Sequence, residues 1–303
     1  GLGDVYKRQV INCFNAGKFT VKGAVGAICN SVSSATVTNC YYSEGTSSIS
    51  QTQSVTAEQL QSWAAAFALN GQGLVQTDSE GAETISWTYL PGSPHPTLYN
   101  PKDTATTKLA PAKDWSEVGR GIDDKLIGPF ASRVPVPAGD GGAEPCKIGS
   151  AEQLAWFAYK VNTVSETGDR PNSSLDANLT SDIASFAGTS YGGGEMTPIP
   201  WVPMDDYTGT FGAGHERPYT LSKLYTNTPG RAGLFGAVKG NASISNIGII
   251  DSDITGDTAG GIVAEVGEDA VVSTCYNKSR ISANGATESY ICLLYTSDAA
   301  DDL

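Results

Sequence analysis

Residues 37–41 read Val-Thr-Asn-Cys-Tyr, and two other stretches follow the same pattern: Val-Ile-Asn-Cys-Phe at 10–14 and Val-Ser-Thr-Cys-Tyr at 272–276. In each stretch a valine stands three positions before a cysteine, and an aromatic residue follows the cysteine. Cys13 and Cys40 are 27 residues apart, and Ile247 precedes Cys275 by 28 residues. A period near this length, built of short strand-like segments and glycine turns, predicts a solenoid.

The solenoid that fits best is a parallel β-helix. A short strand cannot bury an apolar side by itself, so successive turns stack and pair their backbones about 4.8 Å apart. Stacking at this period predicts that Val10 lies beside Val37 and that Ile244 lies beside Val272. The cysteines are then expected to form a ladder of small apolar side chains in the interior.

The corners of such turns need residues that tolerate unusual backbone angles or close packing. The asparagines at 12, 39 and 246 could form a side-chain ladder at one corner. Tandem β-sandwiches are a competing fold with equally frequent turns, but they do not require the same residue every 27 positions. Glycines expected to supply positive φ angles or close backbone approach are Gly26, Gly248, Gly256, Gly260 and Gly261.

The composition indicates an all-β chain that is rich in turns. Glycine accounts for 35 of the 303 residues, and only 17% of the residues are charged. The formal net charge is −13 and the sequence has no basic cluster, so neither nucleic acid nor an anionic membrane is expected as a partner. The length favours two structural units.

The repeats resemble the GLUG-motif repeats of large bacterial surface proteins. The resemblance covers 10–48 and 147–287, including Gly-Leu-Phe-Gly at 233–236 and Ile-Ser-Asn-Ile-Gly-Ile at 244–249. It implies a right-handed parallel β-helix and a secreted or cell-surface location. Gly212 and Ala213 stand where such repeats more often have Asp-Gly, which concerns the chemistry of one turn.

The two ends of the chain resemble translated sequencing-library adapter. Residues 4–9 (DVYKRQ) and 292–297 (CLLYTS) look like two translations of one inverted DNA repeat, the transposase end of such adapters. We therefore set 1–9 and 292–303 aside from fold reasoning and expect 10–291 to be an internal fragment of a longer protein.

Two amphipathic helices are predicted beside the repeats. One begins at Thr56, forms a capping box with Gln59 and stops at Gly71. The other begins at Ser150, with Gln153 as its box partner, and runs to residue 162. Because the ends of a solenoid expose strand edges, both helices are expected to act as caps.

These features predict a definite order of segments. Between the adapter-derived ends 1–9 and 292–303, we expect the last turns of a first β-helix at 10–48, a capping helix and a closing strand (87–98) within 49–100, a proline-rich linker at 101–142, and the start of a second β-helix with its N-terminal capping helix at 143–291.

Five cysteines remain once Cys292 is set aside with the end segment. An odd count without close pairs argues against a disulfide framework, and the sequence leaves their redox state open. They are Cys13, Cys29, Cys40, Cys146 and Cys275.

The side chains that could carry metal chemistry or acid–base chemistry are few. His95 lies between two prolines and His215 lies in a glycine-rich turn, so both are expected to be turn or surface residues. Asp251, Asp253 and Asp257 are spaced somewhat like a calcium loop, but the full ligand pattern is missing, and a solvated strand face is the expectation. No metal site and no cofactor are predicted.

A third group of candidates comes from β-helix enzymes that cleave polysaccharides with clustered carboxylates. Asp205 and Asp206 are adjacent and would point to opposite faces of a strand, so they do not form a dyad by themselves. Asp182, Arg217 and Lys223 could lie nearby, which the sequence leaves open. Aromatic residues that could stack on sugars, but more often pack in a core or cap, are Trp156, Tyr191, Trp201, Tyr207 and Phe211.

The resemblance to GLUG-repeat proteins implies a non-catalytic part of a secreted or wall-attached bacterial surface protein, acting as a structural stalk or adhesin, and the composition permits this. The expected partner is a glycan or protein of a host or neighbouring cell, with no membrane insertion within the fragment. The alternative is the accessory β-helix region of a surface protease or carbohydrate-active enzyme whose catalytic domain lies outside these residues. A β-helix that itself cleaves polysaccharide is a third hypothesis.

Overall fold

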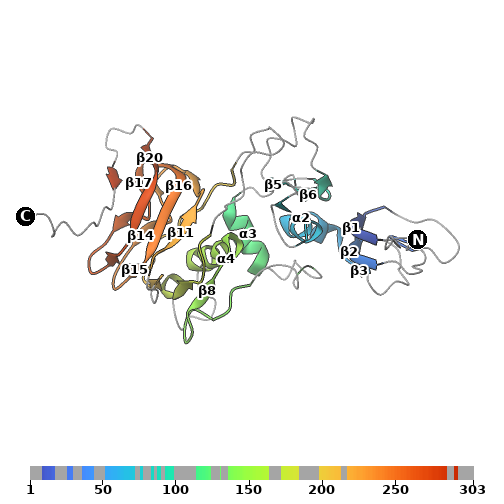
Figure 1. Cartoon of the computed structure of the whole chain (residues 1–303), viewed down its shortest axis with the longest axis horizontal. Helices are drawn as coiled ribbons and strands as arrows, with labels where there is room; N and C mark the ends of the chain where they lie inside the picture. Colours follow the sequence, from blue (N-terminus) through green and yellow to red (C-terminus); the bar gives the residue numbers. More distant parts are fainter. Residues whose placement is uncertain are drawn as a thin grey trace, which may run out of the picture. The chain divides into compact units, whose positions relative to one another are not determined.

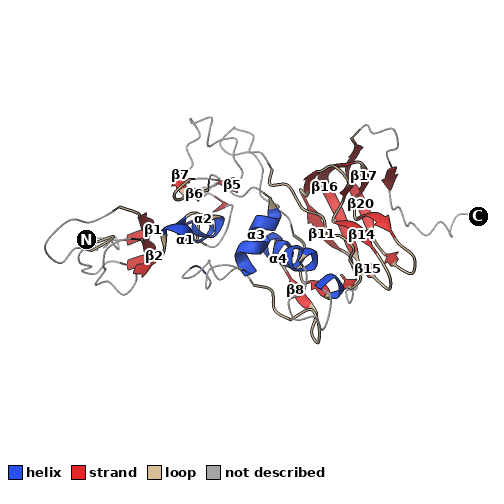
Figure 2. Cartoon of the chain, turned by 180° about the vertical axis from the view of Figure 1, so that it is seen from behind, coloured by secondary structure: helices blue, strands red, loops and turns tan. Residues whose placement is uncertain are grey.

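The chain folds mainly into short strands with a few helices (Figure 2). It divides into two compact units, the first comprising 1–112, 121–135 and 188–197 and the second 113–120, 136–187 and 198–303. The computed structural model describes residues 9–17, 26–29, 36–43, 52–71, 76–77, 83–84, 87–89, 93–98, 114–123, 130, 136–163, 172–183, 198–212, 217–284 and 290–292.

The first unit begins with a parallel three-stranded sheet, in the order β1 (Gln9–Asn15), β2 (Thr36–Tyr42) and β3 (Thr52–Ser54) (Figure 1). Val10 pairs with Val37 and Cys13 pairs with Cys40, which confirms the pairing predicted from the 27-residue spacing. Val37 and Cys40 are buried, and Val10 and Cys13 pack against them, so this face of the sheet is held by apolar contact.

Each cysteine of the repeat follows a residue with a left-handed backbone. Asn12 and Asn39, which precede Cys13 and Cys40, have φ angles of 56° and 52°, and Asn246, which precedes Ile247, has a φ of 59°. Asparagine tolerates this region better than most residues. The predicted ladder is confirmed for the first pair, because Asn39 Nδ2 donates to Asn12 Oδ1 at 3.1 Å. In the last repeat the same position is Thr274, with φ 52°.

Replacing Thr274 with asparagine is expected to stabilise the second unit by about 1 kcal/mol, since a β-branched residue is strained at positive φ. Asn246 precedes it by one repeat, so the new amide would also extend the ladder. Chemical denaturation followed by circular dichroism measures the gain. The reverse change, Asn246→Thr, should destabilise by a similar amount, and equal stability of all three proteins would contradict the explanation.

The predicted glycine corners are only half right. Gly248, Gly256, Gly260 and Gly261 are not among the positive-φ glycines of the described residues, which are Gly71, Gly139, Gly141, Gly212, Gly230 and Gly240. The four do meet close neighbours: a Cβ would collide with a ring at Gly248, with Ala232 at Gly256, with backbone at Gly260 and with Asn277 at Gly261. These glycines therefore serve close packing, while Asn, Asp and other residues make many of the left-handed corners.

The helix predicted at 56–70 is two helices, α1 (Ala57–Leu60) and α2 (Trp63–Leu69). The capping box of Thr56 and Gln59 is confirmed. The break arises because Gln61 leaves helical geometry at ψ 48° and Ser62 then caps a new helix by accepting from Ala65 N. The apolar periodicity carries through the break, which is why it predicts one helix.

The single closing strand predicted at 87–98 is wrong. Trp87–Thr88 (β6) and Thr97–Leu98 (β7) form an antiparallel pair, separated by a segment with three prolines that cannot continue a strand. Asn70 is buried and fixes β6 through two bonds, Nδ2 to Trp87 O at 2.7 Å and Trp87 N to Oδ1 at 2.8 Å. A second antiparallel pair is β4 (Gln76–Thr77) with β5 (Glu83–Thr84).

The range 101–142, expected to be a linker, contains ordered structure. Helix α3 (Trp115–Asp123) buries Trp115 and Val118, and Trp115 N donates to Pro200 O at 3.0 Å. Further along, Ala138 forms an antiparallel bridge with Lys147. The many prolines and the lack of a long periodic run hide this helix in the sequence.

The second unit then presents helix α4 (Ala151–Asn162), as predicted. Ser150 caps it by accepting from Gln153 N at 3.2 Å. The Gln153 side chain, however, accepts from Gly149 N at 2.8 Å. In the predicted capping box it would accept from the N-cap residue itself, Ser150, one residue later. Phe157 on the buried face lies 5.7 Å from Phe211, ring centroid to ring centroid.

In the part of the chain that the structure describes, the remaining strands form four parallel sheets, which the chain visits repeatedly in one order from β10 to β21 (Figure 1 labels several of these strands). The first sheet contains β8 (Cys146–Ile148), β9 (Ala177–Leu179), β10 (Thr210–Phe211), β15 (Ser243–Ser245) and β19 (Val271–Ser273); the second β11 (Tyr219–Ser222), β12 (Tyr225–Asn227), β16 (Ile247–Gly256) and β20 (Tyr276–Ala283); the third β13 (Arg231–Ala232), β17 (Thr258–Gly260) and β21 (Tyr290–Cys292); the fourth β14 (Phe235–Val238) and β18 (Val263–Val266). A short 3-10 helix, η2 (Asn172–Ser174), precedes β9.

Like residues stack on like in these sheets. Phe211 pairs with Ile244, and Ile244 pairs with Val272, which confirms the second predicted pair. In the next sheet Leu221 pairs with Ile249. The core between the sheets is largely apolar, with Thr226 and Ser252 as buried polar exceptions, so regular apolar spacing in the sequence becomes a continuous interior.

Candidate functional sites

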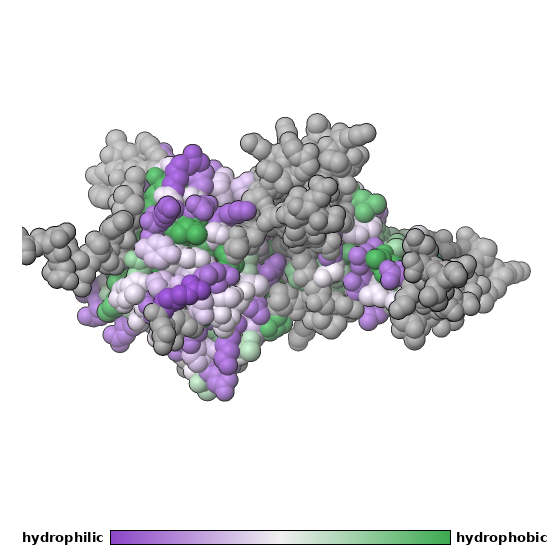
Figure 3. Space-filling view, viewed as in Figure 1, coloured by the Kyte–Doolittle hydropathy of each residue, from purple (hydrophilic) through white to green (hydrophobic). Residues whose placement is uncertain are grey.

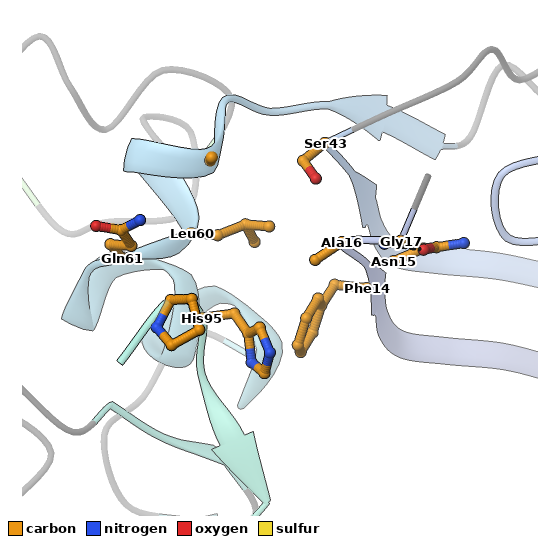
Figure 4. A pocket seen from close by; sticks show the side chains of 10 residues that line it. Phe14, Asn15, Ala16, Gly17, Ser43, Leu60, Gln61 and His95 are labelled. Atoms are coloured by element: carbon orange, nitrogen blue, oxygen red, sulfur yellow. Dashed lines mark hydrogen bonds between the residues drawn. The ribbon is translucent and has the colours of Figure 1, made fainter. Parts of the chain in front are cut away.

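A hollow of about 600 Å³ lies in the first unit, between the end of β1 and the end of α1 (Figure 4). Its size is within the range of small-ligand pockets. The side chains around it are a mixture of apolar and polar groups. Its lining consists of Phe14, Asn15, Ala16, Gly17, Ser43, Ala57, Leu60, Gln61, Pro94 and His95.

Two rings form one wall of this pocket. Phe14 and His95 lie 5.2 Å apart, centroid to centroid, and Trp87 meets the Phe14 ring edge-on at 5.3 Å (Figure 4 shows the first two). His95 Nδ1 is 3.0 Å from Pro96 O. Because a carbonyl only accepts, Nδ1 is the donor in this contact.

One polar side chain of the pocket, Asn15, already makes hydrogen bonds within the protein. Asn15 Nδ2 donates to Ala27 O at 2.6 Å, and Asn15 Oδ1 accepts from Gly17 N at 2.7 Å. These bonds fix the turn after β1. Ser43 and Gln61 supply the hydroxyl and amide groups that could orient a ligand, while Leu60 and the rings supply apolar contact.

The second candidate site is a charge cluster in the second unit, centred on Arg231. Its guanidinium contacts Asp205 Oδ2 at 2.8 Å and Glu265 Oε2 at 3.1 Å. Lys239 Nζ lies 2.6 Å from Asp206 Oδ1. The cluster thus brings three carboxylates and two cations together from segments that are far apart in the sequence.

One carboxylate of the cluster, Asp206, is held in the ionised form, whereas a general acid in glycoside cleavage must be protonated. The hydrogen bond from Lys239 is the main reason that the pKa of Asp206 is lowered, which keeps this group ionised. Asp205, Asp206 and Glu265 are 48%, 57% and 58% exposed, so water screens them. The geometry is that of neutralised surface charges linking successive repeats.

Of the other residues considered with this cluster, Asp182 and Arg217 form a separate ion pair. Asp182 accepts from Thr220 N at 2.8 Å and pairs with Arg217 at 3.2 Å. Arg217 also lies over the Tyr219 ring, 5.1 Å from its centroid. Lys223 sits at a left-handed corner, with φ 64°.

Acid is expected to destabilise the second unit through two of these carboxylates. The pKa of Asp182 is lowered, first by the hydrogen bond from Thr220 N, and that of Asp206 is lowered, first by Lys239. Because each folded pKa lies below the unfolded value of about 3.9, the stabilisation is complete above that value and is lost as pH falls through the folded pKa.

Unfolding temperatures measured by circular dichroism from about pH 6 to about pH 2.5 should therefore fall in acid. The fall should be shallower for Asp206→Asn than for the unchanged protein. Asp251→Asn, which removes an exposed carboxylate outside the cluster, is the matched control and should keep the original slope. Identical slopes in all three proteins would contradict this account.

The three aspartates whose spacing resembles a calcium loop do not share a common partner. Asp253 pairs with Arg280, and Asp257 Oδ2 accepts from Gly230 N at 2.9 Å. Asp251 is exposed at a left-handed corner with φ 48°. Within the described ranges, no three His, Cys, Asp or Glu side chains are arranged so that they could hold a metal ion.

Most of the candidate sugar-stacking residues belong to the core. Trp201, Tyr207 and Phe211 are buried, and Trp201 Nε1 donates to Leu234 O at 3.2 Å. Trp156 is half-buried on α4. Tyr191 and His215 lie outside the described residues.

Sequence reasoning named His95 and the pair Asp205 and Asp206 as candidates, but it did not identify the partners that the fold brings to them. Phe14 lies in a repeat strand and His95 lies in a proline-rich turn, so no periodic pattern in the sequence predicts that they meet. The pair Asp253 and Arg280 is different, because the two residues are 27 positions apart and stack in register. Charge complementarity at the repeat spacing would have identified that pair.

Among the described residues, no helix is both long enough and apolar enough to cross a bilayer. No protein-family model, curated protein or solved structure matches the chain.

Proposed function

We propose that the two units are partial right-handed parallel β-helices of the GLUG-repeat type, and that the chain acts as a structural stalk and adhesin of a secreted or wall-attached bacterial surface protein. The observation that carries this proposal is the parallel register at the repeat spacing: Val10 on Val37 at 27 residues and Ile244 on Val272 at 28.

The repeated order of the four sheets supports the β-helix. Three successive passes place β10, β15 and β19 in one sheet and β11, β16 and β20 in the next. All pairings in these sheets are parallel, which requires a crossover between them, and such crossovers are almost always right-handed. Hydrogen bonds then run along the stacking axis and resist extension of the rod.

The position of α4 supports a role as a cap. It precedes β9 and buries Leu154, Phe157 and Val161, while Phe157 contacts the rings of Tyr207 and Phe211. A helix in this place covers apolar core that another strand layer would otherwise cover, and it blocks an exposed edge.

The outer surface suits a soluble projecting rod. Figure 3 shows mainly hydrophilic residues over the strands of the second unit, with isolated hydrophobic ones. Paired charges such as Asp253 with Arg280 and Glu265 with Arg231 span neighbouring repeats. The pocket beside Phe14 and His95 is the place where a glycan unit or a protein side chain of the partner would dock, by ring contact and by bonds to Ser43 and Gln61.

Adhesion is tested with beads that carry the purified chain, applied to a glycan array and to host-cell monolayers. Retention above that of uncoated beads is expected, with loss of most of it in His95→Ala and Ser43→Ala. Val271→Ala, an exposed site in the second unit, is the matched control and should retain binding. Equal retention of coated and uncoated beads would overturn the adhesive role.

The surface location and the fold have separate tests. Antibodies against 217–284 should label intact producing cells, and labelling only after lysis would contradict the location. For the fold, paired cysteines at Ile244 and Val272 should cross-link in a Cys-free background, whereas a pair at Ile244 and Ile254 should not. The opposite result would refute the stacking.

A further inference from the structure

The first unit gathers three thiols in one small apolar cluster. Cys40 is buried with Val37, and Cys13 and Cys29 pack against this pair. Cys146 and Cys275, in contrast, belong to the other unit and sit in different repeats. The count and spacing of cysteines in the sequence argue against a disulfide framework, but the fold brings two of them to adjacent positions.

Cys13 and Cys40 are direct partners in the parallel pairing of β1 with β2. Neighbouring strands lie about 4.8 Å apart, which is inside the range of about 4.4–6.8 Å between the Cα atoms of disulfide-bonded cysteines. Both side chains leave the same face, because each follows an asparagine with the same left-handed φ, 56° at Asn12 and 52° at Asn39.

The hydrogen bonds of the two thiols agree with this stacking. Cys13 Sγ lies 3.1 Å from Ile11 O and Cys40 Sγ lies 3.3 Å from Thr38 O, so each thiol contacts the carbonyl two residues before it. Cys40 Sγ is also 3.4 Å from Val10 O, on the neighbouring strand.

We propose that Cys13 and Cys40 are an oxidation site, at which a disulfide bond joins successive repeats of the first unit while Cys29 stays a thiol. The proposal depends on the pairing of β1 with β2, and it is independent of the adhesive function. The oxidant is a small-molecule disulfide such as oxidised glutathione.

The reaction has two exchange steps. The Cys13 thiolate attacks one sulfur of the oxidant, forms a mixed disulfide and releases one thiolate. The Cys40 thiolate then attacks Cys13 Sγ, forms the protein disulfide and releases the second thiolate. The two thiol protons pass through solvent to the two released thiolates, so the protein loses two electrons and the oxidant is reduced to two thiols.

The order of the steps follows from burial. Cys13 is half-buried and meets the oxidant first, whereas Cys40 is 1% exposed. Burial is the main reason that the pKa of the Cys40 thiol is raised, so only a small fraction is thiolate at neutral pH. Ring closure is therefore expected to be the slower step and to accelerate as pH rises.

The cross-link is tested on the folded full chain, treated with oxidised glutathione and digested with trypsin without reduction. Trypsin cuts after Lys18 and Lys22, so Cys13 lies on a different peptide from Cys29 and Cys40. Fragmentation of the linked peptides should assign the bond to Cys13 and Cys40. A link to Cys29, or unlinked peptides after complete reaction, would overturn the proposal.

Matched variants give a second readout. Cys29→Ser should keep the cross-link, whereas Cys13→Ser and Cys40→Ser should abolish it, with circular dichroism to establish that each variant is folded. Oxidation should raise the unfolding temperature of the first unit by about 5–10 °C in the unchanged protein and in Cys29→Ser only. No rise despite a mapped bond would overturn the claim that it staples the native repeats.

Discussion

Replacing Phe235 with alanine is expected to lower the free energy of unfolding of the second unit by about 3–5 kcal/mol. Phe235 is fully buried, and its ring centroid lies 5.1 Å from that of Tyr207 and 5.3 Å from that of Phe211. β14 is fixed by its pairing with β18, where Phe235 faces Val263. Backbone hydrogen bonds therefore prevent collapse of the walls, and the lost ring leaves a cavity.

Chemical denaturation followed by circular dichroism measures this loss, with the first unit as an internal reference if the two transitions separate. The matched control is Val271→Ala, because Val271 is 55% exposed and should change stability by no more than about 0.5 kcal/mol. A loss below about 1 kcal/mol for Phe235→Ala would mean that the four aromatic rings do not form the tight core described above.

The parallel pairings could be predicted because the information for them is periodic in the sequence. Apolar residues that recur at 27 or 28 positions must share a face once the strands stack, so Val10 on Val37 and Ile244 on Val272 follow from spacing alone. The register is then fixed, since a slip of one residue would turn every buried side chain toward solvent.

The irregular parts could not be predicted in the same way. Helix α3 begins at Trp115 in a range, 101–142, that contains five prolines, and Trp115 N donates to Pro200 O, which is remote in sequence. The break between α1 and α2 depends on a local cap by Ser62 within an unbroken apolar pattern. A tertiary contact determines the first feature and a side-chain cap determines the second, and the apolar periodicity of the sequence predicts neither of them.

The candidate sites also differ in how far they follow the repeat spacing of the sequence. The pocket joins Phe14 of a repeat strand to His95 of a proline-rich turn, and only the folded chain brings these two rings together. The charge cluster is intermediate, because Arg231 reaches Asp205 and Glu265 at separations that differ from the repeat. Short loops of variable length between strands shift the side chains out of the simple period.

Glycine is required at two corners of the second unit for two different reasons. Gly260 does not need a positive φ, but a Cβ there would collide with the backbone of Val263, with the carbonyl carbon at 2.7 Å. Gly240 is the opposite case, with φ 55° and no atom within 4 Å of an added Cβ. Gly260 is therefore required because a side chain has no space there, and Gly240 is favoured because its backbone has a positive φ.

Gly260→Ala is expected to destabilise the second unit by about 3 kcal/mol, because backbone atoms of paired strands cannot move aside as a flexible side chain could. Gly240→Ala should cost only about 1 kcal/mol, the strain of a left-handed alanine. Denaturation midpoints of both variants, measured side by side, give the comparison. Equal losses would show that close packing at Gly260 adds nothing to backbone preference, and the tight corner between β17 and β18 would then be refuted.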